Sequence, residues 1–416
     1  MTPRRYISRR SLLRRAGAAA AAAAGAPWII PASARGAQGQ PPSGRITVGM
    51  IGTGRQAYLK NMPQFVKMPD VQIVAISDVD AWRMDQMKQA IEKHYGDKRA
   101  SGEHRGLAAY GDHREILARR DVDAVMISTP DHWHVPMAVA AAAAGKDVSL
   151  EKPITRSIAE GQQLIAAIRA HGRVFRVDSE FRSLENFHRM AELVRNGRIG
   201  RIQSVRVGVP AGDDVDCPET PDMPVPEELD YDTWQGPAPR AAYTVERVHP
   251  PKQFGRPGWM RVLWYCDGMI TNWGAHLCDV AQWCFGSERS GPVEIEGEGV
   301  WPAPGKLWNV LRRFAVRYRF ADGTPWVYET VKPYVRFEGS EGWIQAEYPR
   351  GLEAEPLGVG NSSGGDKHQV GGQHPLAVLT LVRDLEPSVR SPYLLQRGPR
   401  VDVHTLPPKL LLEAPS

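Results

Sequence analysis

Residues 45–63 read RITVGMIGTGRQAYLKNMP, and this stretch decides the fold class of the chain. Apolar and β-branched residues predict a strand over residues 46–51, and residues 52–57 form a G-x-G-x-x-A motif that opens a helix. Gly52 permits the tight turn, Gly54 lets a pyrophosphate approach the backbone, and the final alanine leaves room for the helix to pack on the strand. The free amides of the new helix then face the phosphate charge. The stretch therefore predicts the first strand and turn of a dinucleotide-binding domain.

A second strand is predicted over residues 71–78, and it ends at Asp78. A carboxylate there can accept hydrogen bonds from the hydroxyls of an adenosine ribose, which favours NAD and leaves NADP as the alternative. Asp78 could instead cap the helix predicted over residues 81–95. The order of strand, glycine turn, helix, strand and acid favours the cofactor role, in which Arg55 and the helix amides hold the pyrophosphate.

The alternation of strands and helices continues and predicts a parallel, doubly wound sheet. Further strands are expected over residues 123–130, 146–152 and 173–179, and further helices over residues 134–145 and 158–172. Lys152 ends one of these strands, because Pro153 keeps the preceding residue extended and forbids a continuing helix. Ligands of such sheets bind at the carboxyl ends of the strands, so we expect Lys152 on the cofactor face.

The composition is that of a soluble protein long enough for two domains, with 416 residues, 42% of them hydrophobic and 24% charged. The formal net charge of +5 comes from the first 34 residues, which hold six arginines and no acid. The remainder carries 46 basic and 47 acidic residues, so no nucleic-acid partner is expected. The four cysteines show no C-x-x-C or Cys/His zinc spacing, and no metal site is expected.

The first 34 residues predict an export signal. The twin-arginine start SRRSLLRR at residues 8–15 precedes an Ala/Gly-rich apolar stretch over residues 16–30, and an A-x-A cleavage site follows at residues 32–34. The apolar stretch is short and weakly apolar for the alternative, a transmembrane anchor. We therefore expect a signal peptide at residues 1–34 that is read by the twin-arginine export machinery, and a tether at residues 35–44. The processed protein is then periplasmic or otherwise exported, with no membrane contact.

Four ordered motifs resemble the glucose–fructose oxidoreductase/inositol dehydrogenase (Gfo/Idh/MocA) family. They are the glycine motif, TPDHWH at residues 129–134, GKDVSLEKP at residues 145–153 and GAHLCD at residues 274–279. The resemblance implies an α/β chain with an N-terminal Rossmann domain, here residues 45–170, and a C-terminal α/β domain with an open, largely antiparallel sheet, here residues 171–350. It also implies hydride transfer between a small sugar-like substrate and NAD(P). Residues 351–416 do not match the family pattern and are expected to form an irregular tail.

The resemblance also implies roles around the E-K-P element. Lys152 matches a lysine that touches both the substrate hydroxyl and the nicotinamide ribose, and Glu151 belongs to the same cofactor-side element. A cation is useful at this point because negative charge develops on the substrate oxygen as hydride leaves. Asp131 and His134 match an N-x-x-H site beside the cofactor, with Asp in the usual place of Asn.

The second group of implied site residues lies in TNWGAHLCD at residues 271–279. His276 matches the histidine of a D-x-G-x-H-x-x-D pattern and is expected to accept the hydroxyl proton near neutral pH, while Asp279 matches the final acid of the pattern. The first acid of the pattern is Asn272 here, which can bind a sugar hydroxyl but cannot take its proton. Either His276 or Lys152 is then the base. Trp273 and Trp264 are candidates for stacking on a sugar.

Residues 210–257 carry ten prolines and form a long excursion, which is either a lid or oligomer contact near the substrate or surface decoration. The segments at 307–323, 325–331 and 335–348 are expected to be strands of one open sheet, whose exposed face would suit a homo-oligomer. Two rival functions remain open. One is a redox-neutral, NAD-dependent glycosidase on the same fold. The other is a cofactor-bound binding protein that has lost catalysis, for which Asn272 is the best support.

Overall fold

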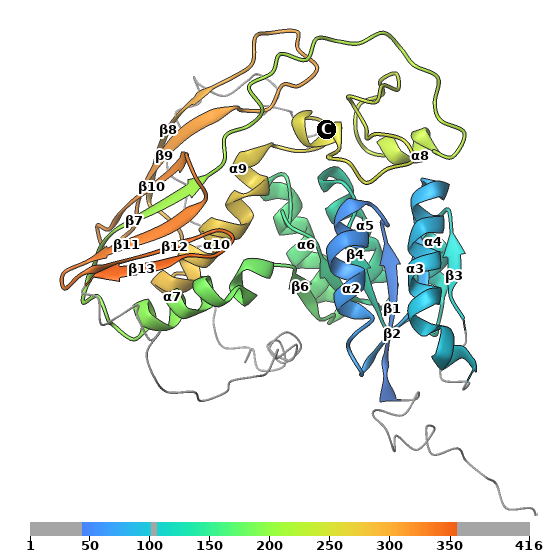
Figure 1. The fold of residues 1–416 in the computed structure, drawn as a ribbon, viewed down its shortest axis with the longest axis horizontal. Coiled ribbons are helices and arrows are strands. Elements are labelled where there is room, and N and C mark those ends of the chain that lie inside the picture. The colour runs from blue at the N-terminus through green and yellow to red at the C-terminus, as the bar shows by residue number, and fades with distance from the viewer. Residues whose placement is uncertain (1–43, 101–105, 356–416) are drawn as a thin grey trace, which may run out of the picture.

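The computed structural model describes residues 44–100 and 106–355, which form two sheet domains side by side (Figure 1). The expected signal peptide, nearly all of the expected tether and residues 356–416 lie outside the described residues. Over the described ranges, none of the helices combines the length and the apolar character that a membrane crossing requires.

The first domain holds a six-stranded sheet in the order β3-β2-β1-β4-β5-β6. Every pair in it is parallel, so the predicted doubly wound sheet is confirmed. β6 lies beyond residue 170, so this sheet extends past the expected domain boundary. The strands are β1 (Ile46–Ile51), β2 (Val71–Ser77), β3 (Ala108–Tyr110), β4 (Ala124–Ile127), β5 (Asp147–Leu150) and β6 (Phe175–Val177).

Helices cover both faces of this sheet, because alternate residues of its central strands face two separate apolar cores. Met50 of β1 lies in one core and Ile51 in the other. α6 shows why a helix begins and ends where it does: the Ser157 side chain accepts a hydrogen bond from the Glu160 amide, and Gly172 ends the helix in the left-handed region. The helical segments are η3 (Ala57–Asn61), α2 (Met62–Phe65), α3 (Ala81–Ala100), α4 (His113–Ala118), η4 (Asp131–Trp133), α5 (His134–Ala143) and α6 (Ile158–His171).

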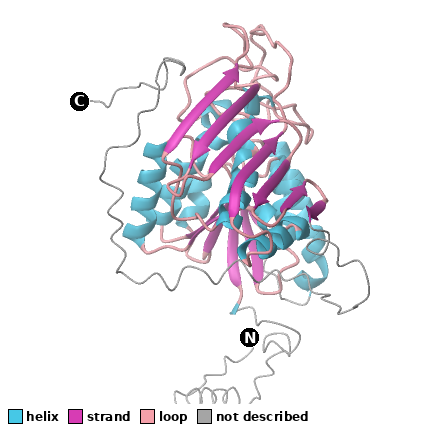
Figure 2. Ribbon diagram, turned by 90° about the vertical axis from the view of Figure 1, so that its left-hand side faces the viewer, coloured by secondary structure: helices cyan, strands magenta, loops and turns pink. Residues whose placement is uncertain are grey.

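The second domain holds a seven-stranded sheet in the order β13-β12-β11-β7-β10-β9-β8. Only the pair of β7 and β10 is parallel, which confirms the expected open, largely antiparallel sheet. Figure 2 shows its strands side by side, with helices behind them. The sheet continues through β13, beyond the expected start of the tail. The strands are β7 (Ile202–Val209), β8 (Glu294–Val300), β9 (Arg313–Arg319), β10 (Pro325–Thr330), β11 (Tyr334–Gly339), β12 (Trp343–Glu347) and β13 (Leu352–Glu355).

One face of the second sheet packs on two helices, α7 (Glu185–Arg195) and α10 (Gly274–Phe285). The short segments η5 (Glu180–Ser183) and α9 (Met269–Asn272) precede these helices and lie toward the first domain. Trp273 keeps helical dihedral angles between α9 and α10, so the two run on almost as one helix. Residues 272 and 276 are therefore one turn apart on a common face.

The proline-rich excursion leaves the second sheet after β7 and crosses over the first domain (Figure 1). It contains α8 (Tyr231–Gln235) and is followed directly by η6 (Gly258–Arg261), and both pack into a separate apolar cluster in which Tyr265 is fully buried. Its backbone bonds directly to the end of β2, where the Ala81 amide donates to the Glu228 carbonyl at 2.8 Å and the Asp230 amide to the Val79 carbonyl at 2.9 Å. The excursion is thus a packed cover on the first domain and not mere surface decoration.

Candidate active site

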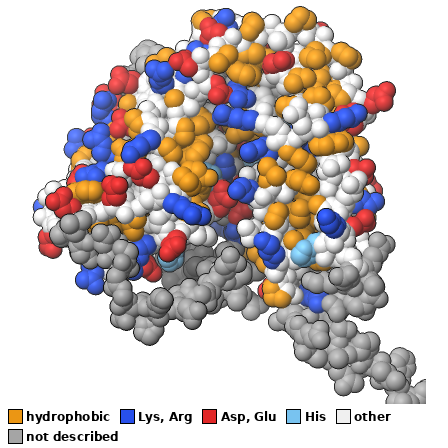
Figure 3. Space-filling view, viewed as in Figure 1, with side chains coloured by type: hydrophobic (Ala, Val, Ile, Leu, Met, Phe, Trp, Pro, Cys, Tyr) orange, Lys and Arg blue, Asp and Glu red, His pale blue; other side chains and the backbone are white. Residues whose placement is uncertain are grey.

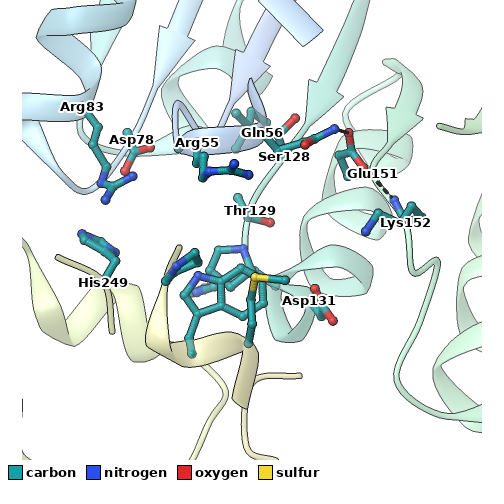
Figure 4. A pocket seen from close by; sticks show the side chains of 18 of the residues that line it. Arg55, Gln56, Asp78, Arg83, Ser128, Thr129, Asp131, Glu151, Lys152 and His249 are labelled. Carbon is teal, nitrogen blue, oxygen red and sulfur yellow. Dashed lines mark hydrogen bonds between the residues drawn. The ribbon is translucent and has the colours of Figure 1, made fainter. Parts of the chain in front are cut away.

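A cavity of about 510 Å³ lies between the two domains and under the excursion. Figure 3 shows the hollow between the two halves of the molecule, with acidic and basic side chains gathered inside it. In Figure 4, Asp78 and Arg83 lie at one end of the pocket, and Glu151 and Lys152 lie at the other. The volume is within the range of small-molecule and cofactor sites.

The glycine turn after β1 forms one wall of the cavity. Gly52 has a φ of +87°, and a Cβ atom there would lie 2.7 Å from the Ser128 carbonyl oxygen, so no other residue fits. A Cβ at Gly54 would have only the Arg83 guanidinium near it, at 3.9 Å. The missing side chain therefore keeps open the space in front of the helix that begins at Arg55, where a pyrophosphate would approach the backbone.

Asp78 lies on the cavity with its carboxylate held in place by the same turn. Its Oδ2 accepts hydrogen bonds from the Thr53 amide at 2.6 Å and the Thr53 hydroxyl at 2.9 Å, and its Oδ1 accepts one from the Asp80 amide at 2.9 Å. The capping role considered for Asp78 belongs to Asp80, which accepts a hydrogen bond from the Arg83 amide at 3.0 Å. Asp78 is thus free to face a ribose.

Trp234 and His249 of the excursion, together with Trp259 directly after it, close the Asp78 end of the cavity. His249 lies with its Nε2 at 2.9 Å from Asp80 Oδ2. Arg83 donates to the backbone carbonyl of Gln253 at 2.9 Å. Because Asp80 and Arg83 belong to the segment that starts α3, these contacts fasten the excursion over the nucleotide half of the cavity.

The glycine turn at Gly52 and Gly54 (the glycine cradle), the Asp78 carboxylate and the volume of the cavity fit NAD, the cofactor that the sequence also predicted. Gly52, Gly54 and Arg55 would hold the pyrophosphate, and Asp78 the adenosine ribose. The described residues contain no group of three or more His, Cys, Asp or Glu side chains placed to hold a metal ion.

Glu151 is 5% exposed and ties the start of the first helix to the end of β5. Its Oε1 accepts hydrogen bonds from Gln56 Nε2 at 3.1 Å and Asn61 Nδ2 at 2.9 Å, and its Oε2 accepts one from the Lys152 amide at 3.2 Å. Asn61 also donates to Asp178 at 2.9 Å. Burial and then the neighbouring Glu151 charge raise the pKa of Asp178, against the opposing effect of Arg176. Glu151 lines the cavity, as expected, and it also sets the position of Lys152.

Lys152 projects from the end of β5 into the cavity, and its Nζ donates to the backbone carbonyl of Asn272 at 3.2 Å. The contact joins the first domain to α9 of the second. It uses the backbone of position 272, so the Asn272 side chain, which also lines the cavity, remains available to a ligand. Lys152 thus lines the same cavity as the glycine turn, and its contact with a cofactor stays a prediction.

His276 reaches the same end of the cavity from α10 and is packed flat against Phe181, with ring centroids 4.1 Å apart. Burial, helped by the nearby Lys152 charge, lowers the pKa of His276 to about 2. The imidazole is therefore neutral at neutral pH, and the expected titration near pH 7 is not what this environment produces. Its Nε2 lies 4.0 Å from Glu180 Oε1, while its Nδ1 is buried and has no partner among the residues that the structure describes.

Trp273 lines the cavity within an aromatic group that includes Tyr348, whose ring it meets edge-on at 5.3 Å. Tyr348 also stacks on Phe181 at 5.0 Å. Trp264 does not line the cavity; the Arg247 guanidinium lies 5.5 Å from its ring centroid. Of the two tryptophans considered for sugar stacking, the geometry therefore retains Trp273.

Two residues expected to touch ligands lie outside the lining. His134 is buried, with Nδ1 at 2.7 Å from the Pro153 carbonyl and Nε2 at 3.0 Å from the Thr129 carbonyl, so it ties together the ends of β4 and β5. Asp279 is occupied by Arg182, which donates to both of its carboxylate oxygens at 2.6 and 2.7 Å. Both residues position the site, and neither faces the cavity.

Asp131 does line the cavity, and it is 4% exposed. Burial raises the pKa of its carboxyl group, and its Oδ2 has no hydrogen-bond partner among the described residues. An unpaired buried oxygen at a cavity wall is a group that a ligand can satisfy. Asp131 thus lines the cavity that the glycine turn also lines, and its role beside a cofactor stays a prediction.

Sequence reasoning missed several lining residues, and most of them come from segments that no motif marks. Glu180 and Phe181 belong to η5, Tyr348 follows β12, and others come from the excursion and from η6 directly after it. The proline-rich composition of the excursion was the only signal for that last group. The missed residues include Lys60, Thr129, Glu180, Phe181, Trp234, His249, Trp259, Met260 and Tyr348.

Comparisons with known proteins match both domains. A model of an oxidoreductase family with an NAD-binding Rossmann fold matches residues 46–179. A model of the C-terminal α/β domain of the same oxidoreductase family matches residues 190–348. The two matches follow the two sheets of the structure closely.

Among curated relatives, dTDP-3,4-didehydro-2,6-dideoxy-alpha-D-glucose 3-reductase of Streptomyces antibioticus is 30% identical over 166 residues, which are 39% of this chain and 46% of that protein. Alpha-N-acetylgalactosaminidase of Shewanella oneidensis is 32% identical over 171 residues, which are 38% of this chain and 36% of that protein. These matches thus span less than half the length of either relative. The solved aldose–aldose oxidoreductase of Caulobacter crescentus superposes with a TM-score of 0.55 at 18% identity, over 76% of this chain and 81% of that one. This last likeness shows the fold.

Proposed function

Because the chain belongs to the Gfo/Idh/MocA family of oxidoreductases, whose NAD-binding Rossmann fold it contains, we propose that it transfers hydride between NAD and a carbinol carbon of a sugar or sugar-like polyol. One observation carries the proposal. A single cavity joins the glycine cradle and Asp78 at one end to Lys152, Asn272 and His276 at the other.

The residues at the substrate end have distinct parts in this reaction. Bound NAD would supply the hydride acceptor. The Lys152 ammonium group stabilises the negative charge that develops on the substrate oxygen, while its bond to the Asn272 carbonyl keeps it in place. His276 contributes a neutral imidazole that can hydrogen-bond at neutral pH. Trp273 and Tyr348 offer apolar faces to the C–H surface of a sugar ring.

The cofactor end favours NAD over NADP in this proposal. The Asp78 carboxylate would accept hydrogen bonds from ribose hydroxyls and would repel a 2′-phosphate at the same place. Its two oxygens are held by the Thr53 and Asp80 amides, so it cannot easily turn away.

A redox-neutral glycosidase is the second candidate, and one observation favours it. Alpha-N-acetylgalactosaminidase of Shewanella oneidensis is among the relatives that match at 32% identity. In such a reaction, transient oxidation of a sugar hydroxyl acidifies the neighbouring C–H, elimination cleaves the glycosidic bond, and the nicotinamide is restored. The same cavity and the same Lys152 would serve both reactions.

One screen separates the two functions. Purified protein would be incubated with D-glucose, D-xylose, myo-inositol and p-nitrophenyl glycosides of N-acetylhexosamines, with and without added NAD, and the products identified by mass. An oxidised sugar together with NADH supports the dehydrogenase. Released nitrophenol with no net oxidation supports the glycosidase. If every substrate remains unchanged and NAD does not bind, the proposed function is wrong.

We extend the proposal to the compartment and the assembly. A twin-arginine signal directs the export of proteins that are already folded. This route suits an exported enzyme that binds NAD before export and keeps it. The cover that the excursion forms over Asp78 supports a slowly exchanging cofactor. The open outer face of the second sheet suits a homo-oligomer, which the sedimentation velocity of the processed protein would test.

A further inference from the structure

Four carboxylates line the cavity, and they differ in what else they bind. They are Asp78, Asp131, Glu151 and Glu180. Asp78 and Glu151 accept hydrogen bonds from backbone or amide donors at both oxygens. Asp131 is 4% exposed, which leaves it out of contact with bulk water.

Glu180 is the exception among these four. No described residue donates a hydrogen bond to its carboxylate, and its side chain is 43% exposed, so it can exchange protons with solvent. It is the first residue of η5 and directly precedes Phe181, whose ring stacks on the His276 imidazole. Its Oε1 therefore lies 4.0 Å from His276 Nε2, at the same end of the cavity as Lys152.

The neighbouring carboxylate decides what His276 can do. A negative charge beside Nε2 favours the tautomer that carries its proton on Nε2, since that N–H can donate to Glu180. In this tautomer Nε2 is a donor and cannot take the hydroxyl proton of a substrate. The other nitrogen, Nδ1, is buried, so it is not exposed to a substrate in the cavity. His276 is therefore suited to hold Glu180 and poorly suited to be the base.

We propose that Glu180 is the general base of this site and that His276 positions it. The carboxylate absent at Asn272 is thus supplied from a different element, by η5 of the same domain. This inference rests on the proposed function, because it names the proton acceptor of that reaction. The separation of 4.0 Å is loose for a hydrogen bond, and catalytic contacts of this kind commonly tighten when the substrate binds.

The reaction balances with the groups present. The O–H bond of the substrate breaks, and its proton bonds to a Glu180 oxygen. The electron pair of the adjacent C–H bond leaves as hydride to bound NAD⁺, so the carbinol is oxidised to a carbonyl and NAD⁺ is reduced to NADH. Glu180 then releases the proton to solvent through its exposed side.

The charges around Glu180 set the pH range in which it works. Burial and then the charges of Glu151 and Asp178 raise its pKa above the ordinary value, while Lys152 and Lys60 oppose the rise. A base must be ionised, so the oxidation rate should rise with pH through this raised pKa and then level off. His276, with a pKa of about 2, would give no such limb in the accessible range.

The first test is kinetic, on whichever sugar of the screen turns over. E180Q should lower kcat about 10²-fold or more and abolish the acidic limb of the pH profile, with NAD still bound. N272D in the E180Q background should restore part of the rate, because positions 272 and 276 share a helix face. E185Q, an exposed glutamate at the start of α7 outside the cavity, is the matched control. An E180Q rate within threefold of the unmodified protein overturns the assignment.

The second test needs no substrate, so it separates this inference from the proposed function. In NAD-loaded protein labelled with ¹³C-glutamate and ¹⁵N-histidine, E180Q assigns the Glu180 carboxyl signal by its loss. Glu180 should titrate above the ordinary glutamate range, His276 should carry its proton on Nε2, and H276Q should shift the Glu180 titration. Failure of every sugar in the screen would count against the proposed function alone. A His276 proton on Nδ1, or a Glu180 titration indifferent to H276Q, would overturn the inference even if sugars turn over.

Discussion

Lys152 shows how one residue can be placed by two different levels of structure. The following proline holds its backbone extended at the end of β5, which is a local effect. Its Nζ is held by the Asn272 carbonyl at 3.2 Å, which depends on the packing of two domains. We expect Lys152→Ala to lower turnover about 10²-fold or more, since one electrostatic donor at the developing charge is lost. NAD content should stay unchanged.

The measurement is the turnover rate together with the nucleotide released on denaturation. Lys67→Ala, an exposed lysine outside the cavity, serves as the control. If the Lys152 variant turns over at the rate of the unmodified protein, Lys152 does not take part in the reaction.

A second prediction about a single residue concerns His276 and the stability of the folded protein. Its pKa is lowered to about 2 in the folded protein, so the folded state resists protonation while the unfolded chain accepts a proton near pH 6.5. His276 therefore leaves the free energy of unfolding unaffected above pH 6.5. Below that pH the free energy of unfolding decreases, because only the unfolded chain binds the proton. At pH 5 the loss should be about 2 kcal/mol, and His276→Gln should remove it.

Urea unfolding at pH 7 and pH 5 would measure this difference. His132, whose pKa is also lowered, to about 3, keeps part of the pH dependence in the variant. His188→Gln changes an exposed histidine on α7 and should leave the pH dependence as it was. If the free energy of unfolding falls equally between pH 7 and pH 5 in the His276 variant and in the unmodified protein, the buried, neutral environment assigned to His276 is wrong.

At the scale of elements, the turn between β1 and the first helix combines two different demands on glycine. Gly52 needs the left-handed region and has the Ser128 carbonyl against it, whereas Gly54 only needs to leave space. We expect Gly52→Ala to destabilise the fold by about 2 kcal/mol or more, through left-handed strain and the clash with β4. Gly54→Ala should leave stability nearly unchanged and weaken NAD binding.

Thermal unfolding and NADH titration on both variants would check this pair. Each variant serves as the control for the other, since the two sites are two residues apart in one turn. Equal losses of stability would mean that the turn adopts a different conformation.

At the scale of the whole molecule, the excursion is the feature that closes the nucleotide end of the cavity. It is fastened by His249 to Asp80 at 2.9 Å and by Arg83 to the Gln253 carbonyl at 2.9 Å. Phe254 adds an aromatic contact by stacking on Tyr58 of the first helix at 4.2 Å. We expect the purified protein to retain NAD, and His249→Ala to release it several-fold faster, because the cover then opens more readily.

The rate of NADH release, followed by its fluorescence after dilution, measures this effect. The control is His188→Ala, which changes an exposed residue of α7, a helix of the second domain that is not part of the cover. Protein that arrives empty and exchanges NAD as fast as the His249 variant would argue against a cover that retains the cofactor.

Local patterns determined the first domain almost completely. A G-x-G-x-x-A turn after a strand has one common solution, and alternating strands and helices predict the parallel sheet that was found. The E-K-P element located Lys152, and the family resemblance, which both domain models confirm, located His276 and Asn272. The very short β3 and the edge strand β8, which is exposed along its whole length, carried too little apolar pattern to be predicted.

The sequence by itself thus determined most strands of the first sheet, several strands of the second, the dinucleotide turn and the residues that carry a motif, because these depend on periodicity and turn chemistry within a few residues. Only the tertiary structure decided that Glu180 stands beside His276, that Arg182 occupies Asp279, that His134 faces two carbonyls, and that the excursion covers Asp78. Apart from the contact between His134 and the nearby Thr129 carbonyl, these contacts join segments distant in the chain, most of them from different elements. Burial and pairing in such contacts depend on how whole elements pack, and a side chain's charge state follows from that packing.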